Sequence, residues 1–246
     1  MRQLLPTLID DVDPLAVYAD LPMATGRPSL RLNMIASIDG ATAVDGLSGA
    51  LGGPADLRIF RTLRSLADVI LVAAGTARAE TYGAVKLPES LSEARLQRGQ
   101  APVPRLAVVS RRLGLDWNSP LFFAASEATL VVTVASAPGD ELRRAGEAGE
   151  VLIAGDNDVD MALALQRLGG LGAGTVLAEG GPTLNGQLAA ANVIDELCLT
   201  IAPWIAAGDS KRIISGAALE LPSRMTLVSL LEEDGVLFVR SRLEKA

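Results

Sequence analysis

The sequence of 246 residues contains no histidine. This absence excludes a Ser-His-Asp triad, histidine metal ligands and acid–base catalysis by an imidazole, and we expect no metal site. The single cysteine, Cys198, cannot form an internal disulfide and is typical of a reducing compartment. Because Cys198 lies in an apolar run, we expect an unreactive thiol.

The chain also lacks basic blocks and long apolar runs. Its net charge of −7 argues against a nucleic-acid or anionic-membrane partner, although a local basic pocket for a phosphorylated small molecule stays compatible with it. No apolar run is long enough to span a bilayer. The first residues include Asp10, Asp11 and Asp13 and lack the apolar core of a signal peptide. We therefore expect a soluble, cytoplasmic protein.

Hydrophobic residues make up 49% of the chain, which is sufficient for a large core. No long linker rich in proline, glycine or serine divides the sequence. We predict a surface lead-in over residues 1–28, with one helical turn, followed by a single domain over residues 29–246.

Short apolar runs alternate with helical patterns, which is typical of a mainly parallel α/β sheet. We expect strands at residues 29–37, 67–74, 106–109, 129–134, 151–154, 176–179 and 196–201. We expect helices at residues 54–65, 76–80, 140–148, 159–168 and from 182 onward. The polar stretch 87–104 predicts a surface loop. Near the C-terminus, alternating residues around the turn Asp234-Gly235 predict an antiparallel hairpin at one edge of the sheet.

The run Val176–Gly186 indicates a buried strand, a turn of two glycines and the start of a helix. Pro182 suits the first helical position, and the glycines allow a ligand to approach the backbone closely. The helix N-terminus favours a phosphate, and Glu179 stands at the strand end, where open α/β sheets bind ligands. The alternative interpretation is an ordinary tight turn with a solvated glutamate.

Other residues also allow a structural and a functional interpretation. Thr76 is expected to cap its helix, which is compatible with a cofactor contact. Ser110-Arg111-Arg112 follow a strand end and suit either a charged loop or a phosphate site. Arg64 on its helix suits either a solvated ion pair or a ligand contact. Asp39 is expected to shape its turn, and Trp117 and Trp204 to lie in the core or an interface.

Four segments, in this order and spacing, resemble the reductase domain of riboflavin biosynthesis. They are Ala36-Ser37-Ile38-Asp39-Gly40, Leu63–Asp68, Gly75-Thr76 followed by Glu80, and Glu179-Gly180-Gly181-Pro182. The similarity extends from about Ser29 to the C-terminus. It implies an α/β, dihydrofolate-reductase-like fold, with a mainly parallel central sheet flanked by helices. It also implies reduction of a phosphoribosylamino-pyrimidine to its ribityl form with NADPH, and a homodimer. The zinc deaminase signature that many members carry is absent from this sequence.

The resemblance also implies roles for individual residues. Substrate contacts would come from Ser48, Arg64 and Glu179. The NADPH contacts would come from Ala36, Ala50, Thr76, Glu80, Gly180, Gly181, Pro182, Thr183, Leu184, Asn185, Gly186 and Gln187, with Ser110, Arg111 and Arg112 suited to its extra phosphate. Three positions depart from the family pattern. Ala50 replaces a common tryptophan, Glu80 a common aspartate, and Leu87 an arginine that helps hold the substrate phosphate. Lys86 can supply a point charge there, without the bidentate fork of arginine.

Three functions stay open at this point. The first is an NADPH-dependent reductase of the phosphoribosylamino-pyrimidine. The second is a reductase of dihydrofolate or another pterin-like ring, which the missing arginine favours. The third is a non-catalytic protein that binds NADPH.

Overall fold

The computed structural model describes residues 1–219 and 222–244, so residues 220, 221, 245 and 246 of the predicted domain lie outside the described residues. Its strands are β1 (Arg2–Leu5), β2 (Ser29–Ser37), β3 (Val69–Ala73), β4 (Arg105–Val109), β5 (Leu130–Thr133), β6 (Glu150–Ile153), β7 (Thr175–Ala178), β8 (Glu196–Ala202), β9 (Met225–Glu233) and β10 (Val236–Leu243). Its helices are α1 (Pro14–Tyr18), α2 (Pro54–Leu66), α3 (Ala74–Ala79), α4 (Glu89–Gln97), α5 (Pro120–Phe123), α6 (Gly139–Ala148), α7 (Met161–Gly170) and α8 (Pro182–Ala190).

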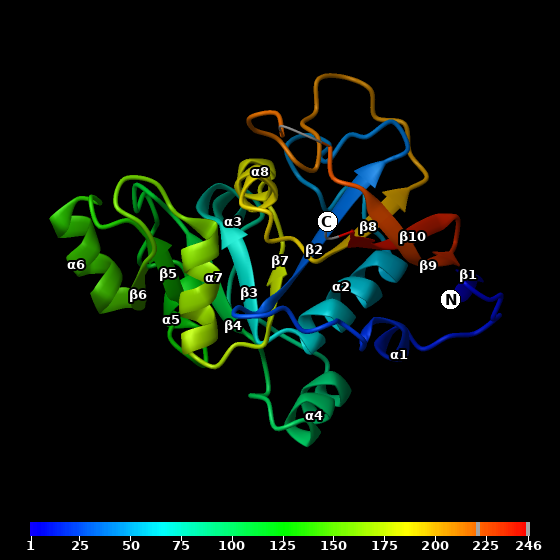
Figure 1. Cartoon of the computed structure of the whole chain (residues 1–246), viewed down its shortest axis with the longest axis horizontal. Coiled ribbons are helices and arrows are strands. Elements are labelled where there is room, and N and C mark those ends of the chain that lie inside the picture. Colours follow the sequence, from blue (N-terminus) through cyan, green and yellow to red (C-terminus); the bar gives the residue numbers. More distant parts are fainter. Residues whose placement is uncertain (220–221, 245–246) are drawn as a thin grey trace.

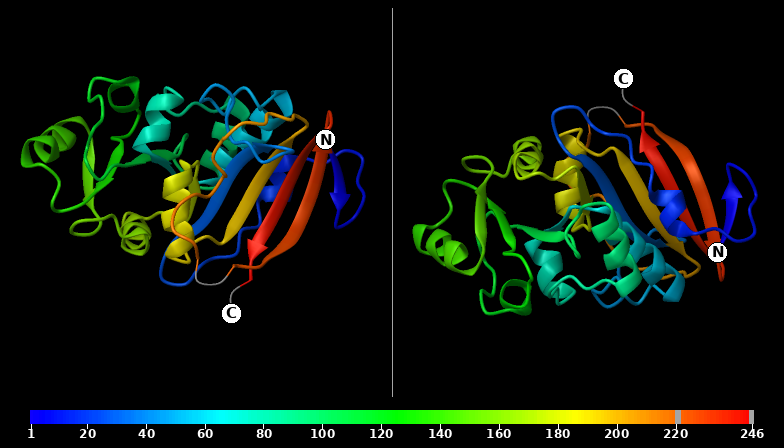
Figure 2. Two further views of the ribbon diagram at one scale, coloured as in Figure 1. Left: turned by 90° about the horizontal axis from the view of Figure 1, so that it is seen from above. Right: turned by 90° about the horizontal axis from the view of Figure 1, so that it is seen from below.

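The strands form one sheet in the order β1-β9-β10-β8-β2-β7-β3-β4-β5-β6 (Figure 1). The ladders from β8 through β6 are parallel, whereas β1, β9, β10 and β8 pair in antiparallel fashion. Helices α2 and α4 lie on one face, and α7 and α8 on the other (Figure 2). The predicted α/β class, with a mainly parallel sheet and an antiparallel C-terminal hairpin, is confirmed.

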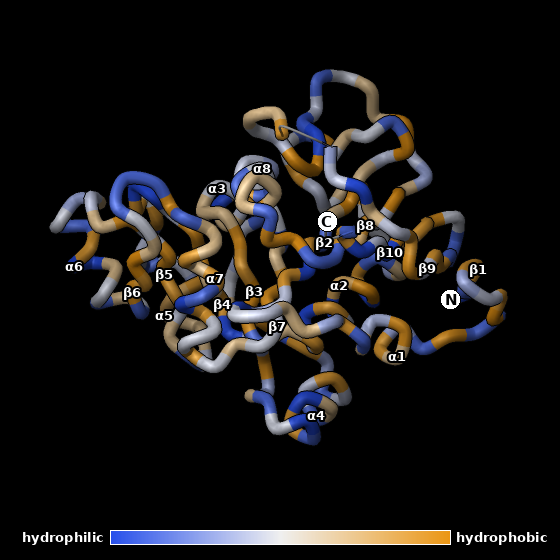
Figure 3. Tube along the Cα trace, in the orientation of Figure 1, coloured by the Kyte–Doolittle hydropathy of each residue, from blue (hydrophilic) through white to orange (hydrophobic). Residues whose placement is uncertain are grey.

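The central parallel strands are apolar because helices cover both of their faces. Strand β3 is buried along almost its whole length, and Figure 3 shows β3 and β7 in hydrophobic colours. Helix α2 starts at Pro54 and buries Ile59 and Leu63 against the sheet. Among residues 1–219 and 222–244, no helix has the length and apolar character needed to cross a membrane.

The N-terminal segment contributes more structure than its sequence predicts. Helix α1 supplies the expected helical turn, but β1 also pairs with β9 and forms the edge of the sheet. The hairpin therefore lies one strand in from the edge rather than at it. The guanidinium groups of Arg31 and Arg240 donate to the backbone oxygens of Tyr18 and Val17, which attaches α1 to the sheet. The boundary between residues 1–28 and 29–246 stays a prediction.

Helix α4 lies in the stretch where a surface loop was expected. Its Arg95 is buried and donates to the backbone oxygens of Ser65, Ala67 and Ala101. The bonds to Ser65 and Ala67 satisfy carbonyl groups at the C-terminal end of α2, where a helix leaves acceptors unpaired. A tertiary contact to a distant helix end therefore holds a helix that has little amphipathic pattern of its own.

Candidate functional site

The site opens where β2 and β7 separate. These strands pair from Ser29–Thr175 to Leu32–Ala178, after which β7 ends in the glycine turn while β2 continues to Ser37. Two adjoining cavities of about 550 Å³ and about 770 Å³ lie along this opening. We call the smaller the α2 cavity, because α2 forms one of its walls. We call the larger the glycine cavity, because Gly75, Gly180 and Gly181 line it.

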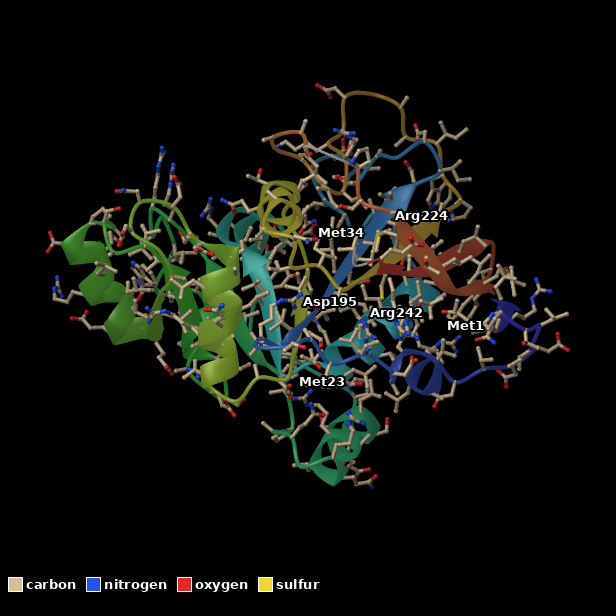
Figure 4. All side chains as sticks on the ribbon, in the orientation of Figure 1. Met1, Met23, Met34, Asp195, Arg224 and Arg242 are labelled. Atoms are coloured by element: carbon tan, nitrogen blue, oxygen red, sulfur yellow. The ribbon has the colours of Figure 1, made fainter. Side chains whose placement is uncertain are left out.

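Six residues line both cavities and mark the boundary between them. They are Met34, Thr42, Ser48, Thr76, Glu80 and Glu179. Met34 is the member labelled in Figure 4, where it lies near the centre of the molecule beside β2 and α8. Two ligands bound in these cavities would therefore meet at this shared wall.

One face of α2 forms a wall of the α2 cavity. Asp56, Phe60 and Arg64 all line it, and their spacing of four residues places them on the same helical face. The guanidinium carbon of Arg64 lies 4.1 Å from the centre of the Phe60 ring, within range of a cation–π contact. The carboxyl of Asp56 accepts a hydrogen bond from the Thr200 hydroxyl at 2.7 Å. Burial raises the pKa of Asp56, against a smaller lowering by that hydroxyl.

Arg64 and Glu179, both predicted substrate residues, meet directly. Nε and Nη2 of Arg64 donate to the two carboxylate oxygens of Glu179, each at 2.7 Å. The Tyr82 hydroxyl donates to the same carboxylate at 2.7 Å. Burial raises the pKa of Tyr82 well above its ordinary value, which keeps this hydroxyl protonated. Burial alone would lower the pKa of Arg64, but the Glu179 carboxylate outweighs it and the pKa is raised.

Tyr82 is a site residue that the sequence analysis missed. It lies in an irregular segment between α3 and α4, and lines the α2 cavity. The pairing of Tyr82 with Glu179 spans 97 positions of the chain, so no local pattern reveals it.

The glycine turn has the backbone geometry that excludes side chains. Gly180 has φ +88° and Gly181 φ +29°. A β-carbon on Gly181 would lie 2.8 Å from Thr76 Oγ1 and 3.0 Å from the β-carbon of Ala73. A β-carbon on Gly180 would lie 3.0 Å from the Met34 sulfur. Both positions therefore require glycine, as a close backbone approach does.

The prediction that Thr76 caps its helix is wrong. Helix α3 begins at Ala74, two residues earlier than expected, with Ala73 at the capping position. Because Thr76 is already inside the helix, its hydroxyl is free to accept the Gly181 N–H, at 3.0 Å. Thr76 thus joins the first turn of α3 to the glycine turn that follows β7.

The remaining predicted residues of α8 divide between surface and core. Thr183 and Gln187 are exposed, whereas Leu184 and Asn185 are buried. The Asn185 amide donates to the Ile213 backbone oxygen at 2.7 Å. A β-carbon on Gly186 would lie 2.2 Å from the Ser215 backbone oxygen, so the segment around residue 215 packs directly on α8. Only Pro182 of this helix lines the glycine cavity.

Two of the other predicted residues lie at the shared wall. The Ser48 N–H donates to the Glu80 carboxylate at 2.8 Å, which holds the loop before α2 against α3. Ala36 is buried on β2 and Ala50 is exposed, and neither lines the α2 or the glycine cavity. Lys86 is exposed and lines neither of these cavities.

Ser110, Arg111 and Arg112 follow β4, at the same end of the parallel strands as the glycine turn. Arg111 forms an ion pair with Asp158 at 2.6 Å, and both side chains are exposed. None of the three residues lines either cavity.

Asp39 attaches a second loop to the site. Its carboxylate accepts a hydrogen bond from the Ser37 hydroxyl and from the N–H groups of Ala206 and Ala207, the latter at 2.7 Å. These hydrogen bonds, that of Ser37 first, lower the pKa of Asp39 to about 2. Residues 206–211 line the glycine cavity, so Asp39 holds one of its walls in place.

The two tryptophans differ in burial. Trp117 packs against the core beside Phe122, whereas Trp204 is 59% exposed. Cys198 is buried, and burial raises the pKa of its thiol to about 12, in agreement with an unreactive cysteine.

Over residues 28–237, the chain matches the protein family described as the RibD C-terminal domain. The chain belongs to this family. A relative from Methanothermobacter thermautotrophicus, named 2,5-diamino-6-ribosylamino-4(3H)-pyrimidinone 5′-phosphate reductase, is 30% identical over 197 residues, covering 79% of this chain and 87% of the relative. A relative of the same name from Archaeoglobus fulgidus is 27% identical over 209 residues, covering 84% of this chain and 95% of the relative.

Among solved structures, a pyrimidine reductase-like protein from Corynebacterium diphtheriae superposes with a TM-score of 0.83. It is 29% identical, and the match covers 95% of this chain and 99% of that protein. The family resemblance predicted from four short segments is therefore confirmed. The family match and the two relatives named as reductases place the chain in a family of reductases.

Proposed function

We propose that this chain is an NADPH-dependent oxidoreductase of the cytoplasm that acts in riboflavin biosynthesis. Its substrate is a phosphoribosylamino-pyrimidine, whose ribosyl group it reduces to ribityl. The observation that carries this proposal is the pair of adjoining cavities with one shared wall. The names of the two pyrimidinone phosphate reductases support the substrate class.

The glycine cavity fits a dinucleotide. Gly180 and Gly181 leave no side chain between the backbone and a ligand, and the first-turn N–H groups of α8 have no partner within the helix. Such a helix N-terminus suits a pyrophosphate. When bound, NADPH supplies the hydride for reduction.

The protein's own contribution is to position the two reactants. Arg64, Glu179 and Tyr82 form a hydrogen-bonded group in the wall of the α2 cavity, where they orient the substrate. The loops held by Asp39 and Glu80 line the glycine cavity. Holding donor and acceptor close is the main way such a protein accelerates hydride transfer.

A second substrate class is favoured by the charges around the α2 cavity. Among the described residues, Arg64 is the one cation that lines this cavity, and Glu179 already pairs with it. A dihydrofolate-type or other pterin-like ring needs no phosphate site there.

Steady-state oxidation of NADPH with each substrate tests the function. We expect turnover of the ribosylamino-pyrimidine phosphate, and turnover of dihydrofolate alone would select the second substrate class. Tight NADPH binding without turnover of either substrate would establish a non-catalytic binding protein instead.

We also expect a preference for NADPH over NADH that depends on Arg111 and Arg112. Both follow β4 at the ligand-binding end of the sheet. Losing a charge-assisted hydrogen bond costs roughly 1.5–3 kcal/mol, or about ten- to hundredfold in affinity. Calorimetric titration of both cofactors into the parent protein and the double variant Arg111→Ala/Arg112→Ala measures this. Equal affinities in the parent protein would refute it.

Finally, we propose a homodimer formed by the face of the sheet that points away from α1 and α2. Leu199, Val239 and Leu230 are direct neighbours across β8, β10 and β9, and all three are half-buried. Such an apolar row on an uncovered face is typical of an interface between subunits.

A further inference from the structure

Asp56 lies on the side of the α2 cavity that is away from the glycine cavity. It lines the α2 cavity but, unlike Glu80 and Glu179, it does not line the glycine cavity. The residue belongs to the first turn of α2, and its Oδ1 accepts a hydrogen bond from the hydroxyl of Thr200 on β8 at 2.7 Å. This bond fixes the carboxyl between the helix and the sheet.

The Asp56 carboxyl has acceptor capacity left for a ligand. A carboxylate offers about four lone-pair sites, and the Thr200 hydroxyl occupies one of them. Oδ2 lies beside Gly52, which also lines the cavity, since a β-carbon on Gly52 would be 3.0 Å from this oxygen. Burial raises the pKa of Asp56, and the hydroxyl offsets this only in part. A ligand that donates further hydrogen bonds would therefore stabilise the charged carboxylate.

Two other carboxyl groups of the lining are already engaged. The Glu179 carboxylate accepts hydrogen bonds from Arg64 on both oxygens, and one more from Tyr82. The Glu80 carboxylate accepts a backbone N–H of the loop before α2 at 2.8 Å. Asp56 is therefore the carboxyl in this lining whose hydrogen bonding a ligand can best complete.

Apolar side chains surround Asp56 in the cavity wall. Leu57 and Phe60 of α2 line the cavity together with Ile35 of β2. Ile35 is the direct neighbour of Thr200 across β2 and β8, so the hydroxyl that holds Asp56 lies next to this apolar wall. Mostly apolar walls with a few placed polar groups are typical of a site for a flat heterocycle, and the polar groups decide which edge of the ring binds.

The proposed reaction determines which edge of the ring points toward Asp56. The sugar carbon that receives the hydride is joined to ring carbon C6 through the amino nitrogen. This sugar carbon must lie at the shared wall, where the cofactor and the substrate meet. Ring atom N3 is opposite C6, and C2 is next to N3. The N3–C2 edge is therefore farthest from the shared wall, on the side where Asp56 lies.

We propose that Asp56 determines which base the α2 cavity accepts, and that it selects a 2-aminopyrimidinone over the corresponding uracil. The 2-amino group and N3–H are adjacent donors, which match the two oxygens of a carboxylate in a bidentate pair. In the uracil, a carbonyl oxygen replaces the 2-amino group and faces a carboxylate oxygen, so a hydrogen bond is lost and two acceptors meet. This inference rests on the proposed function for the ribosylamino-pyrimidine, and it adds the substituent at C2 that the site selects.

The test compares two ligands that differ only at C2. The 2-amino and 2-oxo forms of the ribosylamino-pyrimidine 5′-phosphate are titrated by calorimetry into the full chain in the presence of NADP⁺. We expect the 2-amino form to bind about ten- to hundredfold more tightly, as the loss of a charge-assisted hydrogen bond predicts. Equal dissociation constants, or tighter binding of the 2-oxo form, would overturn the inference. Failure of both ligands to bind overturns it too.

The variant Asp56→Asn should reverse this preference. The asparagine amide offers one acceptor and one donor side by side, which match the N3–H and the C2 carbonyl of the uracil. If Asp56 only complemented the positive end of α2, its loss would weaken both ligands alike. The matched control Asp140→Asn removes an acidic residue from the first turn of α6, outside both cavities, and should leave the ratio of dissociation constants unchanged. An unchanged ratio in folded Asp56→Asn overturns the inference, and the parent titration decides it if that variant does not fold.

Turnover is measured separately on the same protein, so the two proposals can fail independently. If the 2-amino form binds more tightly but neither form is reduced, the proposed activity fails and the inference stands. If both forms are reduced and bind with equal dissociation constants, the activity stands and the inference fails.

Discussion

Glu179 is the residue on which the site depends most. It directly follows β7, and its carboxylate accepts two hydrogen bonds from Arg64 on α2 and a third from Tyr82. Its place at a strand end is visible in the sequence, since a glycine pair follows an apolar run. The partners are not, because they come from positions 115 and 97 residues away.

Substitution of this ion pair should affect catalysis and leave the cofactor in place. We expect Glu179→Gln and Arg64→Ala to keep NADPH affinity within a few fold. Each should lower kcat/KM by roughly 1.5–3 kcal/mol, the value of a charged hydrogen bond. The losses should not add in the double variant, because both residues belong to one pair. Steady-state kinetics measures this, and thermal melts of each variant serve as the control. Full activity in both folded variants would remove them from the substrate site.

Gly181 allows a second test at this scale. Its φ of +29° is unfavourable for any side chain, and a β-carbon would collide with Thr76. Gly181→Val should therefore lose NADPH affinity and also about 1–3 kcal/mol of stability, the range for a strained backbone conformation. The matched control is Gly146→Ala, because a β-carbon there meets nothing within 4 Å. A Gly181→Val protein with the parent melting temperature and parent NADPH affinity would contradict the described turn.

Individual contacts limit what a sequence can predict. A threonine after a strand and a glycine is typical of a helix cap, but Thr76 bonds to Gly181 because α3 starts earlier. An arginine in a polar stretch is typically solvated, but Arg95 is buried against the end of α2. In both cases the hydrogen-bond partner, Gly181 for Thr76 and Ser65 for Arg95, is distant in the chain.

At the scale of elements, the sequence predicts the strands and helices whose burial is visible in their own residue pattern. The parallel strands are short and apolar because both faces are covered, and α2 and α6 appear where expected. The elements that the sequence does not predict, β1, α4 and α5, are short and are held by partners elsewhere in the fold. Their own residues carry little periodic pattern.

The loop that follows β8 should respond to acid through Asp39. The pKa of this carboxyl is lowered from 3.8 to about 2 by the hydrogen bonds that hold the loop. The attachment is therefore complete above about pH 3.8 and is lost as the pH falls through about 2. Fluorescence of Trp204, which lies in this loop, should report the release in a Trp117→Phe background.

The variant Asp39→Asn provides the control for this titration. It should show the released signal already at neutral pH, together with weaker NADPH binding, because residues 206–211 line the glycine cavity. Far-UV circular dichroism separates loop release from acid unfolding of the whole chain. A Trp204 signal that changes only together with the circular dichroism would contradict a local release.

At the scale of the whole molecule, the uncovered sheet face predicts self-association. Val239→Lys places a charge at the centre of the row formed with Leu199 and Leu230. We expect this variant to sediment as a monomer while the parent chain sediments as a dimer, because a desolvated lysine opposes an apolar interface. Leu96→Lys, on the exposed face of α4, is the matched control and should leave the dimer unchanged. A monomeric parent chain would refute the dimer.

The early end of the β2–β7 ladder has a consequence for what the cleft can hold. From Asn33 onward, β2 keeps β8 on one side, but the ladder with β7 stops at Leu32. The backbone groups on that side face the opening rather than another strand. A flat ring with a carboxamide, placed there edge-on, would take the position of the missing strand and continue the sheet's hydrogen bonding with a small molecule. The cleft then lies where a further strand would pair with β2.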